Sequence, residues 1–149
     1  EDLKQMLVDA ASVGLNLTLE SGYVSFEEQK EKYTNAVSKH KKKNKSSTVK
    51  AEAAVKKTTP NAGECEQQTG LLLKFSSGTT KKFAESAEFF WLQKNSINYG
   101  FVLRYPEKEN TGGLSYSAEL YRYVGKEYAL QMRSYNMNLD EFVQYINCQ

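Results

Sequence analysis

Trp-Leu-Gln-Lys-Asn-Ser-Ile-Asn-Tyr-Gly-Phe-Val-Leu-Arg-Tyr-Pro, residues 91–106, is the stretch of sequence that decides the fold. Its first residues complete a pattern of large apolar side chains spaced by three or four over 83–94, which predicts an amphipathic helix. Residues 99–105 are short and aromatic-rich, which favours a strand that Pro106 ends. A helix followed directly by an aromatic strand is therefore the centre of the predicted fold.

Periodicity and end signals outward from this stretch predict further helices and short strands. Helices are expected at 1–15, from Ser25 towards Val37, at 49–57, at 126–135 and from an Asn138 cap that Glu141 completes, and strands at 15–19, 70–75 and 120–124. Helices and strands do not alternate regularly, so a doubly wound parallel sheet is not indicated. The sequence predicts an α+β fold in which helices flank a small antiparallel sheet.

Length and charge limit the classes of protein to consider. The chain has 149 residues, close to the usual size of one domain, so a single domain over 1–149 is expected. The formal net charge of +2 does not indicate a nucleic-acid partner. The sequence contains no run of about 18 apolar residues that could span a bilayer. The chain begins with Glu1, so membrane anchoring is expected only through segments outside it.

Lysines are concentrated in the run His-Lys-Lys-Lys-Asn-Lys at 40–45. This run is poor in core-forming residues, and we predict a basic, mobile surface loop at about 39–48. Such a loop could contact an anionic polymer or lipid, or it could simply be solvated. His40 is the sole histidine of the sequence, so a histidine-rich metal site is excluded.

Two cysteines, Cys65 and Cys148, leave two interpretations open. They could form one disulfide if the protein is exported, or they could be unrelated thiols. A free-thiol assay would distinguish these interpretations.

Four segments in order along the chain resemble the VanY-like D-alanyl-D-alanine carboxypeptidases. They are SGYVSFEEQ (21–29) beside the family's SGYRSYExQ, ECEQQTGLLLKF (64–75) beside SEHQTGLAVDF, residues 91–106 beside WLxxNxxxYGFxLRYP, and SYSAELYRYVGKE (115–127) beside YEPWHYRYVGKE. The resemblance extends from about residue 3 to residue 146. It implies the D-Ala-D-Ala carboxypeptidase/hedgehog-like metallopeptidase fold.

The resemblance also implies where a zinc site would lie. Family members hold zinc with two histidines and an aspartate, and use a glutamate as general base and an arginine to polarise the substrate. The positions are, in chain order, Val24 for the arginine, Gln67 and Lys74 for the first histidine and the aspartate, and Ser117 and Leu120 for the glutamate and the last histidine. All five residues are replaced. We therefore expect a pseudoenzyme without metal or other cofactor.

Lys74 is the most informative of the five replacements. A buried ammonium needs a partner, which Glu66 or Glu119 could supply. One hypothesis is that Lys74 partly replaces the charge of the metal and holds the empty cleft closed. The alternative is that its side chain extends to solvent.

Other residues of the same motifs are candidates for the cleft of the predicted fold. Possible contacts with a partner are assigned to Gln29, Cys65, Glu66, Glu119 and Arg122. The predicted function is a binding, structural or regulatory module of the bacterial cell envelope, of Gram-positive type, with a protein or a peptidoglycan peptide as partner. The alternative is a D-alanyl-D-alanine carboxypeptidase that retains activity through a non-standard site.

Overall fold

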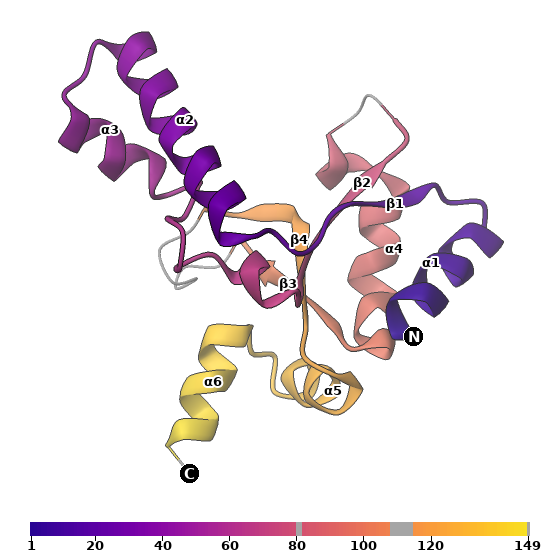
Figure 1. The fold of residues 1–149 in the computed structure, drawn as a ribbon. Coiled ribbons are helices and arrows are strands. Elements are labelled where there is room, and N and C mark those ends of the chain that lie inside the picture. Colours follow the sequence, from indigo (N-terminus) through magenta and orange to yellow (C-terminus); the bar gives the residue numbers. More distant parts are fainter. Residues whose placement is uncertain (80–81, 108–114, 149) are drawn as a thin grey trace.

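The computed structural model describes residues 1–79, 82–107 and 115–148. The elements follow in the order α1 (Asp2–Ser12), β1 (Leu17–Ser21), α2 (Phe26–Asn44), α3 (Thr48–Val55), η1 (Glu66–Thr69), β2 (Leu72–Ser77), η2 (Phe83–Glu85), α4 (Ala87–Asn95), η3 (Ser96–Tyr99), β3 (Phe101–Tyr105), β4 (Ser117–Tyr123), α5 (Lys126–Ser134) and α6 (Leu139–Asn147), as Figure 1 shows. No helix within the described ranges is long and apolar enough to cross a membrane.

The strands form one antiparallel sheet in the order β1-β2-β4-β3, so the predicted α+β fold class is confirmed. Helices α1 and α4 lie beside the sheet (Figure 1), and their buried Met6 and Leu92 belong to one core cluster with Phe75, Phe101 and Tyr121 of the strands. Burial of these large apolar side chains is the main stabilising contribution. The face that carries the core also fixes the strand register, because a one-residue slip would turn every side chain to the opposite face.

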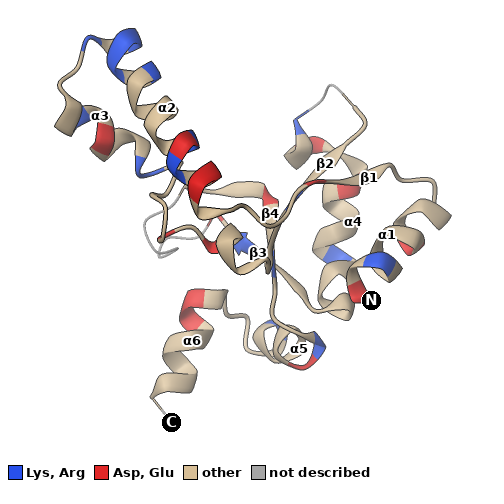
Figure 2. Cartoon of the chain, in the orientation of Figure 1, with Lys and Arg blue, Asp and Glu red and all other residues tan. Residues whose placement is uncertain are grey.

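Helix α2 extends through most of the lysine run, so the loop predicted at 39–48 is wrong for residues 39–44. Lysine is a good helix former, and lysines in the last turn are favoured by the helix dipole. Val37 packs on Ala51 and Val55 of α3, which holds α2 and α3 as a hairpin. The hairpin extends away from the sheet, and Lys and Arg gather at the far end of α2 (Figure 2).

The helix predicted over 83–94 is interrupted at Ser86. Its hydroxyl donates to the carbonyl of Phe83 and accepts from the backbone N–H of Phe89, so it ends η2 and caps α4. Apolar spacing alone predicts one helix here, because a serine inside an apolar pattern does not reveal its hydrogen bonds. At the C-terminal end, the predicted capping box of Asn138 and Glu141 is confirmed by two reciprocal hydrogen bonds.

Candidate functional site

The positions identified by the resemblance come together at one side of the sheet. Lys74 of β2 is paired with Leu120 of β4 on one side and with Ser21 of β1 on the other. The Gln67 side chain donates to the Ser21 hydroxyl over 2.9 Å, and the backbone N–H of Val24 donates to the Gln67 carbonyl over 3.3 Å. The sequence motifs thus define a common site in space.

Ser117, at the position of the family's glutamate, begins β4 opposite Tyr105 of β3. Burial raises the pKa of the Tyr105 phenol to about 12. Its ring lies 4.6 Å from the guanidinium carbon of Arg104. The phenol therefore stays protonated at neutral pH.

A cleft of about 150 Å³ lies between α2, η1 and the sheet. It is lined by Gln29, Lys32, Thr59, Pro60, Cys65, Glu66, Gln67, Leu72, Tyr105 and Leu120. Gln29 is buried and its amide donates to the carbonyl of Pro60, which anchors α2 to the rim. Of the five residues predicted to form the cleft, Gln29, Cys65 and Glu66 line it, whereas Glu119 and Arg122 do not.

The residues at the three zinc positions do not fit a zinc ion. The Gln67 amide is engaged with Ser21, Lys74 carries a positive charge, and Leu120 has no lone pair. Zinc in proteins is held by histidine, cysteine and carboxylate ligands. Within residues 1–79, 82–107 and 115–148, no three such side chains gather closely enough to hold a metal.

Lys74 is instead the centre of an ion triad. Its Nζ lies 2.9 Å from Glu20 Oε1 and 3.3 Å from Glu119 Oε2. Burial opposes the charge, but the hydrogen bonds and charges of the two glutamates outweigh it and raise the pKa of the ammonium. Of the two glutamates predicted as partners of Lys74, Glu119 is confirmed and Glu66 is wrong. The second partner is Glu20, which the sequence did not indicate.

Glu66 belongs to a second ionic cluster, which the sequence did not predict. Arg104, 8% exposed, donates to Glu66 over 2.7 Å and to both carboxylate oxygens of Asp140 over 2.9 and 3.1 Å. Burial opposes the charge on Arg104, but hydrogen bonds to both carboxylates raise its pKa. The sequence signal was an arginine inside the apolar strand Phe-Val-Leu-Arg-Tyr, because a buried charge requires a partner.

Arg122 extends the same cluster. It donates to the Thr69 hydroxyl over 2.9 Å, and its guanidinium lies 3.9 Å from Glu66 Oε2. That oxygen is buried and accepts no hydrogen bond from the described residues. Glu66 lines both the cleft and a groove of about 730 Å³ beneath α6. Among the residues that line the cleft, Glu66 supplies the carboxylate.

The two cysteines are free thiols. Cys65 is buried at the cleft, whereas Cys148 is exposed at the end of α6. The possible disulfide between them is not formed in this structure. Cys65 therefore contributes a small, weakly polar group to the cleft wall.

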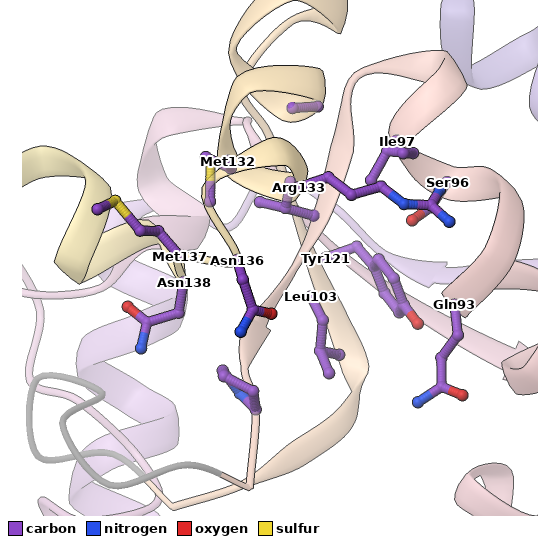
Figure 3. Close-up of a pocket in the computed structure, with 13 residues that line it drawn as sticks. Gln93, Ser96, Ile97, Leu103, Tyr121, Met132, Arg133, Asn136, Met137 and Asn138 are labelled. Carbon is purple, nitrogen blue, oxygen red and sulfur yellow. The ribbon is translucent and has the colours of Figure 1, made fainter.

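A further pocket, of about 460 Å³, lies apart from the cleft, between η3, β3 and α5 (Figure 3). Gln93, Tyr121 and Arg133 are among its lining residues. The Tyr121 hydroxyl is buried without a hydrogen-bond partner among the described residues, a group that an ordered water commonly satisfies. None of the five positions derived from the family motif lines this pocket.

The fold and the cleft define a carboxypeptidase-fold domain, and comparison with known proteins supports this class. The sequence model of the VanY family, described as D-alanyl-D-alanine carboxypeptidase, matches residues 1–126. The chain belongs to the VanY D-alanyl-D-alanine carboxypeptidase family.

Individual relatives agree with this assignment. A D-alanyl-D-alanine carboxypeptidase of Enterococcus faecium is 31% identical over 148 residues, which cover 98% of this chain and 43% of that protein. The structure of VanYB in complex with D-alanine-D-alanine has a TM-score of 0.85 at 29% identity, covering 96% of this chain and 78% of that one. A vancomycin-resistance D,D-pentapeptidase VanY variant in complex with Zn(II) has a TM-score of 0.83 at 28% identity, covering 95% and 79%. The chain spans about half the length of the curated relatives it matches.

These comparisons correct one prediction. The chain was expected not to be an enzyme, but its family and its relatives are named as carboxypeptidases, which points to an enzyme. The replaced zinc ligands do not by themselves establish that activity is lost.

Proposed function

We propose that this domain is a carboxypeptidase that acts on peptidoglycan stem peptides ending in D-alanyl-D-alanine, through a site other than the family's zinc ligands. The observation that carries the proposal is the match of the family model to residues 1–126. The likeness to a structure that holds D-alanine-D-alanine supports the same substrate class. Because that substrate belongs to the cell wall, the proposed location is the cell envelope. A protein partner and a Gram-positive host stay predictions.

The cleft offers groups suited to a peptide end. Lys32 on α2 is a cation at the rim that can pair with a terminal carboxylate. Leu120 and Pro60 provide apolar surface for small side chains such as the methyl groups of alanine. A volume of about 150 Å³ matches the end of a peptide rather than a whole stem.

Glu66 is our candidate for activating a water molecule. A glutamate can accept a proton from a water that attacks the scissile carbonyl, and can return that proton to the amine of D-alanine as the C–N bond breaks. Its Oε2 has no hydrogen-bond donor among the described residues, while Arg104 holds the other oxygen over 2.7 Å. Arg104 thus orients the carboxylate through one oxygen, and the other oxygen is buried without a donor among the described residues.

The test is incubation with a synthetic pentapeptide ending in D-Ala-D-Ala, with free D-alanine measured over time. We expect release of D-alanine, and none from the same peptide ending in L-Ala-L-Ala. Glu66→Gln should reduce the rate at least about 100-fold if Glu66 is the base. Glu64→Gln, which alters an exposed carboxylate, is the matched control.

Calorimetric titration of the same peptide separates catalysis from binding. Binding without release would reject the proposed reaction and leave recognition of the peptide. Neither binding nor release by folded protein would reject the substrate class as well.

A further inference from the structure

We infer that the Glu20–Lys74–Glu119 triad occupies the place of the family's metal and takes over its cross-linking role, so that the strands are joined by an internal cation and the site takes no zinc. A bound metal stabilises a fold by tying together ligands from separate segments. In this chain the three ligand positions lie on η1, β2 and β4. An ammonium on β2 with carboxylates on both neighbouring strands joins the sheet at the same point.

The positions of the strands make this possible. Strand β2 lies between β1 and β4 in the sheet, so a side chain on β2 can reach both. Lys74 contacts Glu20 on β1 over 2.9 Å and Glu119 on β4 over 3.3 Å. One ammonium therefore bridges three strands.

Both glutamates lie where strand pairing is irregular. Leu19 pairs with Phe75 and Ser21 pairs with Lys74, which leaves Glu20 as an extra residue in β1. Such bulges redirect side chains and are commonly found next to functional sites.

On the other side of Lys74, Ala118, Glu119 and Leu120 of β4 stand opposite the single residue Arg104 of β3. Regular alternation would turn Glu119 to the face opposite Leu120, the residue that is paired with Lys74. The Glu119 carboxylate nevertheless lies 3.3 Å from the ammonium.

Burial and charge exclude a metal at the same point. The Lys74 side chain is 33% exposed, so its ammonium is partly removed from water and depends on its two partners. A divalent cation there would meet the ammonium at short range and would compete with it for both carboxylates. The Gln67 amide, already bonded to Ser21, offers no replacement for a histidine.

The first test titrates the purified, metal-free protein with zinc by calorimetry and measures thermal unfolding with and without EDTA. We expect no one-to-one binding at micromolar zinc and an unchanged midpoint. The combined variant Gln67→His, Lys74→Asp and Leu120→His should gain one-to-one zinc binding and a midpoint that falls in EDTA. Micromolar zinc binding by the unchanged protein, or a midpoint lowered by EDTA, would overturn the inference.

The second test removes the cross-link itself. Lys74→Met keeps most of the side-chain volume and should raise the unfolding equilibrium constant about tenfold. Two ionic contacts are lost, and the two carboxylates then repel each other without the ammonium between them. Lys56→Met, which breaks the exposed pair with Glu64, is the control and should change the constant less than about threefold. Equal effects of the two substitutions would contradict a cross-linking role. Glu119→Gln provides the same comparison if Lys74→Met does not fold.

This inference is independent of the turnover proposed above. Release of D-alanine that EDTA abolishes would support the proposed substrate and reaction, but it would contradict a site independent of zinc and would overturn the inference. Release that EDTA leaves unchanged supports both. Absence of release, with no zinc binding, would reject the reaction and leave the triad's role intact.

Discussion

Replacing Asp140 by asparagine tests how α6 is attached to the sheet. Asp140 is in the first turn of α6 and accepts two hydrogen bonds from Arg104, at 2.9 and 3.1 Å. Asparagine has nearly the same shape but lacks the charge, and its amide group would face the guanidinium. Arg104 is only 8% exposed, so water cannot replace the lost partner readily.

The size of the effect follows from burial. Breaking a fully buried ion pair costs about 3–5 kcal/mol, and a hydrogen bond to a charged group contributes about 1.5–3 kcal/mol. The Asp140 side chain is 28% exposed and Glu66 still pairs with Arg104, so the lower range applies. We expect Asp140→Asn to lower the free energy of unfolding by about 2 kcal/mol. For a chain of this length the melting temperature should fall by about 4–8 °C.

Urea unfolding followed by circular dichroism measures the free energy, and thermal unfolding measures the shift in midpoint. Glu64→Gln is the matched control, because its carboxylate is 53% exposed and pairs with Lys56 at the surface. We expect that control to change the free energy of unfolding by less than about 0.5 kcal/mol. If both substitutions had the same small effect, the Arg104 cluster would not hold α6 in place.

Three other predictions concern single groups. Gly100→Ala should lower the free energy of unfolding by more than about 2 kcal/mol in urea, because φ is +83° and a Cβ would lie 2.8 Å from the backbone of Gly125. Gly14→Ala is the control: φ is +80° but the space is open, so it should cost about 1 kcal/mol. Equal losses for the two variants would contradict a steric clash at Gly100. The Tyr99 hydroxyl donates a hydrogen bond to Asp9 of α1, which raises the pKa of Tyr99 to about 12. The stabilising contribution of this hydrogen bond is therefore present below about pH 10 and is lost as the pH rises through about 12. Tyr99→Phe should remove one tyrosine from the late phase of an absorbance titration at 295 nm, and an unchanged late phase would refute this. Ellman's reagent should modify Cys148 at once and Cys65 only after unfolding; two fast thiols, or none in denaturant, would contradict two free thiols of unequal burial.

Much of the fold could be predicted from local signals. The strand after 91–99, the capping box at Asn138 and the helix that follows Ser25 depend on neighbouring residues, so the sequence shows them directly. The end of α2 was missed because composition suggested a solvated segment, whereas packing of Val37 against α3 supports a longer helix. Helix α4 begins later than predicted, since the Ser86 hydroxyl bonds depend on the conformation of the chain at that point.

The candidate site, too, could be predicted from the sequence only in part. The collinear motifs identified the positions of Gln67, Lys74 and Leu120, and the structure brings these three together. They could not show that Glu20 reaches Lys74, because that contact depends on a bulge in β1 that shifts the register by one residue.

By itself, then, the sequence determined the fold class, the order of most helices and strands, the family resemblance and which residues stand at the family's ligand positions. These properties follow from hydrophobic period, capping residues and motif spacing, which are all local along the chain. Only the tertiary structure decided the partners of each charged group: Glu20 and Glu119 for Lys74, and Glu66 and Asp140 for Arg104. The physical reason is that an ion pair depends on atoms that are far apart in sequence meeting within about 4 Å, and strand register and helix docking determine that distance.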